Sequence, residues 1–109
     1  MTEQSVGFNY HEKVINSYCN RAYQIAKSKG WHEEKRETGT LLALIHSEVS
    51  EALEADRKGD LENFKEELAD IVIRVFDLCG SRNIDLGKVI EEKMLKNEGR
   101  EYKHGGKKY

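Results

Sequence analysis

Apolar residues recur every three to four positions along most of the chain, which is the period of an α-helix rather than of a strand. Residues 40–58 carry such a stripe and are followed by Gly59, a residue suited to the left-handed conformation that ends many helices. A second stripe begins after Asp60, whose carboxylate can cap a helix, and we expect it to stop at Gly80. The two stripes predict an antiparallel helical hairpin that turns at Gly59 and Asp60.

Two further helices are expected to flank this hairpin. Residues 9–29 carry apolar side chains on one side and are followed by Gly30, and Asp85 is placed to cap a last helix that ends near Asn97. No segment alternates between apolar and polar residues as a strand does, and the chain contains no proline. We therefore expect an all-α protein, a four-helix bundle with the hairpin at its centre, in a single domain spanning residues 1–109.

The stripe of the second hairpin helix is wider than one neighbouring helix can cover. On a helical wheel it extends from Leu78 through Val72 to Ile73, an arc of about 220°. Because so short a chain has few other helices to cover this arc, we expect a second subunit to do so, in a homodimer or homotetramer. A monomer that buries the whole stripe internally is the alternative.

Charge and cysteine content exclude several classes of protein. The net charge of −2 on 109 residues argues against bulk binding of nucleic acid. Cys19 and Cys79 fall on the apolar sides of predicted helices and lack zinc-ligand spacing, so we expect buried, reduced thiols. There is no signal-peptide pattern and no apolar run near the ~18 residues that span a bilayer. We expect a cytoplasmic protein with neither a membrane nor a nucleic-acid partner.

Four acidic residues are placed symmetrically about the predicted turn. Glu48 and Glu51 form an ExxE motif, Glu67 and Asp70 form an ExxD motif, and each pair lies on one face of its helix. In a hairpin with its midpoint at Gly59, Glu48 is level with Asp70 and Glu51 is level with Glu67. Gathering like charges is costly unless a cation neutralises them, and carboxylate oxygens suit Mg²⁺ or Mn²⁺. We therefore expect the four acids to bind Mg²⁺, with Mn²⁺ as the alternative ion.

A single ExxE motif on an amphipathic helix is more often a solvated face than a metal site. Here, however, Glu48 falls at about 340° on the wheel, between apolar neighbours, and Glu51 falls at the edge of the same arc. Glu67 lies beside Ile71 at the edge of the second arc. Carboxylates in such places need a partner, which favours the metal site over the solvated face.

Basic residues outnumber acidic ones by six to two from residue 93 to the end of the chain. Lys93 and Arg100 share a helical face with Asn97. Lys103 and His104 lie in a glycine-containing loop whose backbone N–H groups could close over an anion. A basic segment together with an acidic metal site suits a metal-bound polyphosphate, whereas a frayed basic terminus is the alternative.

Trp31 lies in the charged connection between the first helix and the hairpin, and it is the only tryptophan. Near a metal site its indole could stack on a nucleobase, although a lone tryptophan at a helix end more often covers the core. Both interpretations stay open from the sequence.

Three segments, HSEVSEALEA, FKEELADIVIRVFDL and EEKMLKNEGREYKHGGKK, resemble the MazG-like all-α nucleoside triphosphate pyrophosphohydrolases over about residues 38–107. The resemblance implies a domain that cleaves a nucleoside triphosphate between its α- and β-phosphates, giving a monophosphate and pyrophosphate, in a dimer or tetramer. It implies Mg²⁺ binding by Glu48, Glu51, Glu67 and Asp70, and phosphate contacts by Lys93, Asn97 and Arg100, with Lys103 and His104 as further candidates. Residues 1–37 carry no matching motif, so the base of the substrate is left open.

Within that reaction Glu51 is the expected general base. It lies at the rim of its apolar arc, where water can reach it, whereas Glu48 lies deeper and is better suited to holding metal. One alternative is a relative in the same superfamily that acts on phosphoribosyl-ATP or on a specific dNTP. Another is a non-catalytic helical regulatory or binding module, whose acids pair with Arg57, Arg74 or lysines. A carboxylate-bridged di-iron protein ranks last, because the ExxH motif it needs on two bundle helices occurs only in the tail.

Overall fold

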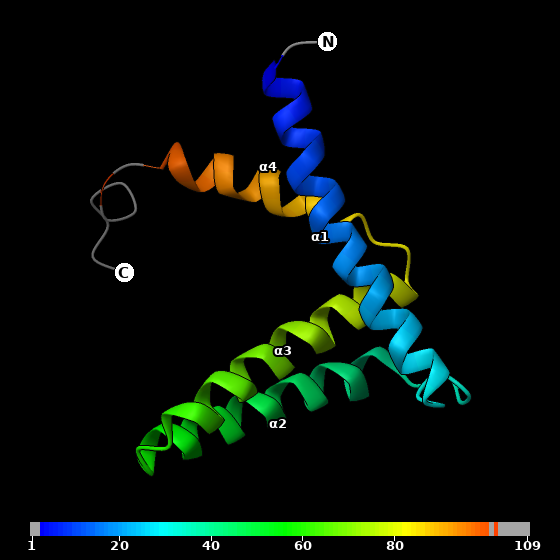
Figure 1. Cartoon of the computed structure of the whole chain (residues 1–109), viewed down its shortest axis with the longest axis vertical. Coiled ribbons are helices and arrows are strands. Elements are labelled where there is room, and N and C mark those ends of the chain that lie inside the picture. Colours follow the sequence, from blue (N-terminus) through cyan, green and yellow to red (C-terminus); the bar gives the residue numbers. More distant parts are fainter. Residues whose placement is uncertain (1–2, 101, 103–109) are drawn as a thin grey trace. The chain divides into compact units, whose positions relative to one another are not determined.

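The computed structural model describes residues 3–100 and residue 102. Within them the chain forms four helices and no strands (Figure 1). The helices are α1 (Glu3–Ser28), α2 (Thr38–Arg57), α3 (Leu61–Ser81) and α4 (Leu86–Glu98). The predicted all-α class is confirmed. None of the described helices is both long enough and apolar enough to cross a membrane.

The described part of the chain divides into two compact units. One unit is Ser17–Ile84, which holds the later part of α1 together with α2 and α3. The other combines the residues up to Asn16 with those from Asp85 onward, and so holds the beginning of α1 together with α4. The predicted acidic motifs all belong to the first unit, whereas the basic residues of α4 belong to the second.

α2 and α3 pack against each other as the predicted hairpin (Figure 1). Gly59 follows α2 with φ at +70°, and the backbone N–H of Asp60 donates to the carbonyl of Ala55 at 3.0 Å. The side chain of Asp60 then caps α3 by accepting from the backbone N–H of Asn63 at 3.1 Å. The turn therefore forms at the two residues that the sequence indicated.

Gly80 does not end α3, contrary to expectation, because the helix continues to Ser81. A Cβ atom at Gly80 would collide with the backbone carbonyl oxygen of Cys19 and would lie 2.8 Å from the Cβ of Tyr23. Glycine is therefore needed here for the close approach of α1 to α3. The thiols of Cys19 and Cys79 are free and buried beside this contact, as expected, and burial raises the pKa of both.

In the other unit, the side chain of Asn16 on α1 is hydrogen-bonded to the beginning of α4. Asp85 caps α4 by accepting from the backbone N–H of Lys88 at 3.1 Å. Asn16 donates through Nδ2 to Oδ1 of Asp85 at 2.8 Å, and its own Oδ1 accepts from the backbone N–H of Gly87 at 2.9 Å. The sequence indicated Asp85 as a cap but gave no reason to single out Asn16.

The described core is thin. Its buried apolar residues are all small: Cys19, Ala22, Ala52, Ala55 and Cys79. No large side chain in the described ranges is fully buried. Besides Ile73, six large apolar residues of the hairpin are instead about half exposed, and we call these six the apolar face: Leu42, Val49 and Leu53 on α2, and Leu61, Leu68 and Val72 on α3. In each helix the three are spaced seven and then four residues apart, which places them on one side of that helix.

Candidate active site

Three of the four predicted acids converge within the hairpin, and we call them the acidic cluster. Glu48 on α2 and Glu67 and Asp70 on α3 each bring one carboxylate oxygen within 4.8 Å of the others. The hairpin places Glu48 and Asp70, which are equidistant from Gly59, at the same level, and Glu67 lies one turn from Asp70 on the same face of α3. Glu51 lies outside this tight group, and it lines a neighbouring hollow together with Glu67.

Glu67 is the least satisfied member of the acidic cluster. Its Oε2 atom is buried and has no hydrogen-bond partner among the described residues. Burial raises the pKa of Glu67 to about 7, aided by hydrogen bonding with Glu48 and Glu51 and by the charges of those two carboxylates. A carboxylate that has lost its proton can accept hydrogen bonds but cannot donate one. Glu67 can therefore donate a hydrogen bond to a neighbouring carboxylate only while it keeps its own proton. A divalent cation would relieve the same repulsion and would bind all the carboxylates in their ionised form.

Glu48, by contrast, is paired with a cation of the chain itself. Nε of Arg74 donates to Oε1 of Glu48 at 3.0 Å, with the two side chains 29% and 13% exposed. Burial disfavours the ionised form of Glu48, but hydrogen bonds with Arg74, Glu67 and Glu51 outweigh it and hold the pKa of Glu48 below its ordinary value. The pairing with Arg74 is what a non-catalytic module predicts. The unpartnered Glu67 oxygen is not, because a structural carboxylate at a buried position is normally paired.

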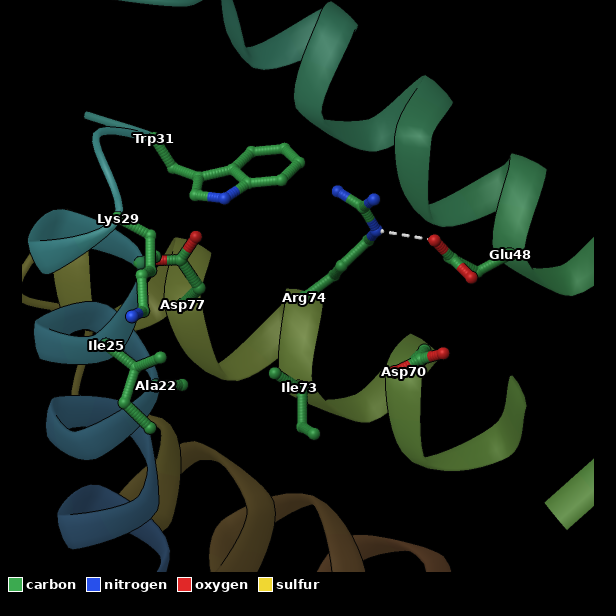
Figure 2. Close-up of a pocket in the computed structure, with 10 residues that line it drawn as sticks. Ala22, Ile25, Lys29, Trp31, Glu48, Asp70, Ile73, Arg74 and Asp77 are labelled. Atoms are coloured by element: carbon green, nitrogen blue, oxygen red, sulfur yellow. Dashed lines mark hydrogen bonds and ion pairs between the residues drawn. The ribbon is translucent and has the colours of Figure 1, made fainter. Parts of the chain in front are cut away.

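A pocket of about 320 Å³ opens beside the acidic cluster, and we call it the Trp31 pocket. Figure 2 shows Asp70, Arg74 and Asp77 following one another along α3, with Glu48 facing them from α2 and the indole of Trp31 above. The apolar walls come from Ala22, Ile25, Ala26 and Ile73. The pocket therefore joins an apolar, aromatic space to the carboxylates of Glu48 and Asp70.

Trp31 lines this pocket and is 47% exposed. Two guanidinium groups lie over its ring. The Cζ atom of Arg36 is 5.2 Å from the ring centroid, and that of Arg74 is 5.6 Å away. Arg74 thus contacts both Trp31 and Glu48, and it lies between the aromatic part of the pocket and the acidic cluster (Figure 2).

Asp77, two turns beyond Asp70 on α3, also lines the Trp31 pocket. Its Oδ1 atom lies 2.7 Å from Nε2 of His32, and each of the two side chains is 23% exposed. The His32 ring in turn packs edge-on against Tyr23, with centroids 5.0 Å apart. The wheel places Asp77 beside Asp70, but nothing in the sequence connected His32 to Asp77.

Glu51 is exposed on α2 and, together with Glu67, lines a second hollow of about 410 Å³ towards the turn of the hairpin. Ser50, Lys58 and Asn63 contribute polar groups to the same hollow. Water can therefore reach Glu51, as its position at the rim of the apolar arc predicted.

The predicted phosphate-binding residues lie apart in the chain from the carboxylates. Lys93 and Asn97 are exposed on α4, and Arg100 is exposed just after this helix. Lys103 and His104 lie outside the described residues. A phosphate-binding role for these five residues stays a prediction.

A family profile described as the MazG nucleotide pyrophosphohydrolase domain matches residues 36–104. The match includes α2, α3 and α4 and both acidic motifs, and it agrees closely with the 38–107 region singled out by the sequence motifs. Neither the curated proteins nor the solved structures contain a match to this chain. Because the matched region is well over half of the chain and carries the expected helices, the protein belongs to the MazG nucleotide pyrophosphohydrolase domain family.

Proposed function

We propose that the protein is a Mg²⁺-dependent nucleoside triphosphate pyrophosphohydrolase, which converts a (d)NTP and water into a (d)NMP and pyrophosphate. The observation that carries this proposal is the buried Oε2 of Glu67, which has no hydrogen-bond donor in the described part of the chain although Glu48 and Asp70 crowd it. Carboxylate oxygens are ligands for a hard cation, which favours Mg²⁺ and makes Mn²⁺ the alternative. Family membership supplies the reaction class.

In this proposal Glu48, Glu51, Glu67 and Asp70 hold the metal. The ion supplies neutralising charge for phosphate oxygens and lowers the pKa of nearby water. Glu51 accepts a proton from the attacking water, which its exposure and its contact with Glu67 support. The water oxygen bonds to the α-phosphorus while the bond to the α–β bridging oxygen breaks, and pyrophosphate leaves. The phosphate contacts are assigned to Lys93, Asn97, Arg100, Lys103 and His104.

The nucleoside part of the substrate is assigned to the Trp31 pocket. The pocket has apolar walls, an exposed indole and a direct connection to Glu48 and Asp70. Such a combination suits a base that stacks on Trp31 while its phosphates reach the carboxylates.

The apolar face is assigned to contact with a second copy of the chain, in a homodimer or homotetramer. The six large apolar side chains of this face are about half exposed, while the described core buries only small residues. An exposed surface of this kind is unusual on a monomer. A second copy would bring the same six residues to the contact, as a two-fold interface requires.

A panel of canonical and modified NTPs and dNTPs, together with phosphoribosyl-ATP, tests the reaction. Each compound is incubated with the protein in Mg²⁺ or in EDTA, and the products are separated by ion-exchange chromatography. We expect a monophosphate and pyrophosphate in Mg²⁺ and no turnover in EDTA. Orthophosphate as the first product would contradict the proposal. Turnover of phosphoribosyl-ATP or of one dNTP alone would support the more specialised relative.

One observation favours a second candidate function, the non-catalytic helical module. The pair between Arg74 and Glu48 neutralises part of the acidic cluster without any metal. This candidate predicts no product from any compound in the panel, together with a melting temperature that Mg²⁺ leaves unchanged.

A further inference from the structure

We infer that Asp77, held in place by His32, selects the nucleobase by accepting a hydrogen bond from an exocyclic amino group. The site would then favour guanine, cytosine and adenine nucleotides over those of uracil, thymine and hypoxanthine. This inference rests on the proposed function, because it requires a nucleotide whose base occupies the Trp31 pocket.

The position of Asp77 along α3 suits contact with the base. It lies seven residues from Asp70, and so on nearly the same side of the helix and about 10 Å further along its axis. Asp70 belongs to the acidic cluster, where the metal and phosphates would bind, whereas Trp31 and Asp77 line the part of the pocket beyond Arg74 (Figure 2). A nucleotide with its phosphates at Asp70 and its base against Trp31 would bring the edge of the base towards Asp77.

Asp77 keeps an oxygen with which to bind a base. The contact with His32 uses Oδ1, and an ionised carboxylate has two oxygens with about four acceptor positions. The side chain is 23% exposed, so it remains accessible from the pocket while being partly shielded from water. Its orientation is set in advance, since His32 is itself packed against Tyr23.

The chemistry of a carboxylate determines which bases fit. A carboxylate only accepts, so it attracts an amino group and repels the carbonyl oxygen that uracil and thymine carry where cytosine has its amino group. Hypoxanthine carries such a carbonyl where adenine has its amino group, and it has only a hydrogen where guanine has its amino group. Lys29 lines the same pocket and only donates. Guanine, cytosine and adenine each carry both an amino group and acceptor atoms, and can therefore satisfy Asp77 and Lys29 together.

Two pairs of substrates that differ in the relevant group test the inference: dCTP against dUTP, and GTP against ITP. We expect wild-type kcat/KM to be at least about tenfold higher for the amino member of each pair, as for a hydrogen bond to a charged group. Asp77→Asn, which adds a donor at the same position, should reduce each ratio to about twofold or less, mainly through KM for the amino substrates. Asp56→Asn is the matched control, because Asp56 is exposed on α2 and lines neither hollow, and its ratios should equal those of wild type.

His32 acts through Asp77, so it is a positioning residue and needs a separate variant. His32→Phe should lower the amino preference without abolishing turnover, and His32→Gln, which retains an N–H donor, should restore part of that preference. A purely structural role would lower the melting temperature of His32→Phe and leave the substrate ratios of the folded protein unchanged.

The outcomes separate this inference from the reaction on which it rests. Equal wild-type rates within both pairs, or an unchanged ratio in Asp77→Asn, would overturn base selection by Asp77 while leaving pyrophosphate formation intact. Absence of pyrophosphate from every substrate would instead refute the proposed function, and the inference with it. If Asp77→Asn did not fold, the wild-type ratios and the two His32 variants would still decide the matter.

Discussion

Glu67 keeps a buried carboxyl oxygen unpartnered within the described ranges, beside Glu48 and Glu51. Folding gains nothing from such an arrangement unless a proton or a cation neutralises it. The hairpin brings Glu48 level with Asp70 because their distances from Gly59 match, and Glu67 lies on the same face of α3 as Asp70. The charges of these acids then resist their approach. We interpret this group of mutually repelling carboxylates as a binding site, because energetically unfavourable arrangements in folded proteins occur mainly at functional sites.

Neutralising Glu67 should separate stability from activity. We expect Glu67→Gln to leave the metal-free protein as stable as wild type or more stable, because it removes a repelled carboxyl group. It should also lower hydrolysis by on the order of 10²-fold or more, since even residues outside a metal's ligand set cost 10–100-fold when changed. Thermal melts in EDTA and in Mg²⁺ should show a smaller metal-induced rise in the variant than in wild type.

The control for this variant is Glu66→Gln, on the neighbouring exposed residue, which should match wild type in both measurements. A destabilised Glu67→Gln beside a wild type indifferent to Mg²⁺ would instead show that Glu67 is half of a structural pair. Both the metal site and the proposed reaction would then be wrong.

The raised pKa of Glu67 predicts how stability depends on pH without metal. The folded-state pKa of about 7 exceeds the ordinary value of 4.5, so the folded protein binds this proton more tightly than the unfolded chain does. The resulting stabilisation is complete below pH 4.5 and is lost as the pH rises to 7 and beyond. In EDTA we therefore expect this group to lower the melting temperature between about pH 5 and 8, and Glu67→Gln to flatten that fall.

Magnesium should reverse the trend, because it binds the ionised carboxylate. The rise in melting temperature on adding Mg²⁺ should grow over the same pH interval in wild type and change less in Glu67→Gln. The lowered pKa of Glu48 acts separately, since its contribution is lost only as the pH falls below the ordinary value of 4.5. A metal-induced rise that is the same at pH 5 and pH 8 would contradict the assignment of Glu67 to the metal.

At the level of helices, the contact between α1 and α3 depends on the absence of a side chain at Gly80. The hypothetical Cβ at this position overlaps the backbone carbonyl of Cys19, and backbone cannot move aside as the end of a flexible side chain can. The same contact buries Cys19 and Cys79. Helix propensity alone would favour alanine at position 80, so packing between helices outweighs local preference here.

Gly80→Ala should therefore destabilise the protein by about 1–3 kcal/mol, the usual cost of overpacking. Gly39→Ala is the matched control, because Gly39 lies within α2 and an added Cβ meets no atom within 4 Å. That substitution should stabilise by about 0.5–1 kcal/mol through helix propensity. Denaturant unfolding of both variants checks the opposite signs, and a Gly80→Ala protein as stable as wild type would refute the close approach.

At the scale of the whole molecule, residues of the broad apolar arc expected on α3 lie at two different surfaces. Ile73, at its edge, lines the Trp31 pocket, whereas Leu68 and Val72 belong to the apolar face. These exposed residues are large, and those in the described core are small. An isolated chain would therefore leave more apolar surface in water than is usual for a stable monomer.

Leu68→Lys should shift the protein to smaller species in sedimentation velocity at micromolar concentration, because a charge cannot be buried in an apolar contact without a partner. Glu66→Lys places a lysine on the same helix, about 160° away around the axis, and should leave the assembly intact. A wild type that is already monomeric would contradict the assignment of the apolar face.

The sequence by itself determined the helices, their order and the turn. Apolar periodicity indicated α1 to α4, although α1 begins at Glu3 rather than at residue 9. Gly59 and Asp60 marked the turn, and the distances of Glu48 and Asp70 from that turn predicted their meeting. These features depend on local spacing and on a single reversal of the chain, so they can be derived without knowing any other contact. The single domain over residues 1–109 and the oligomer stay predictions.

Only the tertiary structure decided which groups meet across helices. It showed that Gly80 serves a helix contact rather than a helix end, that Arg74 pairs with Glu48, and that His32 holds Asp77 at the Trp31 pocket. Each contact joins segments far apart in the chain. Their partners are set by how whole helices pack and by which side chains then share the little buried space, and neither periodicity nor motif spacing contains that information.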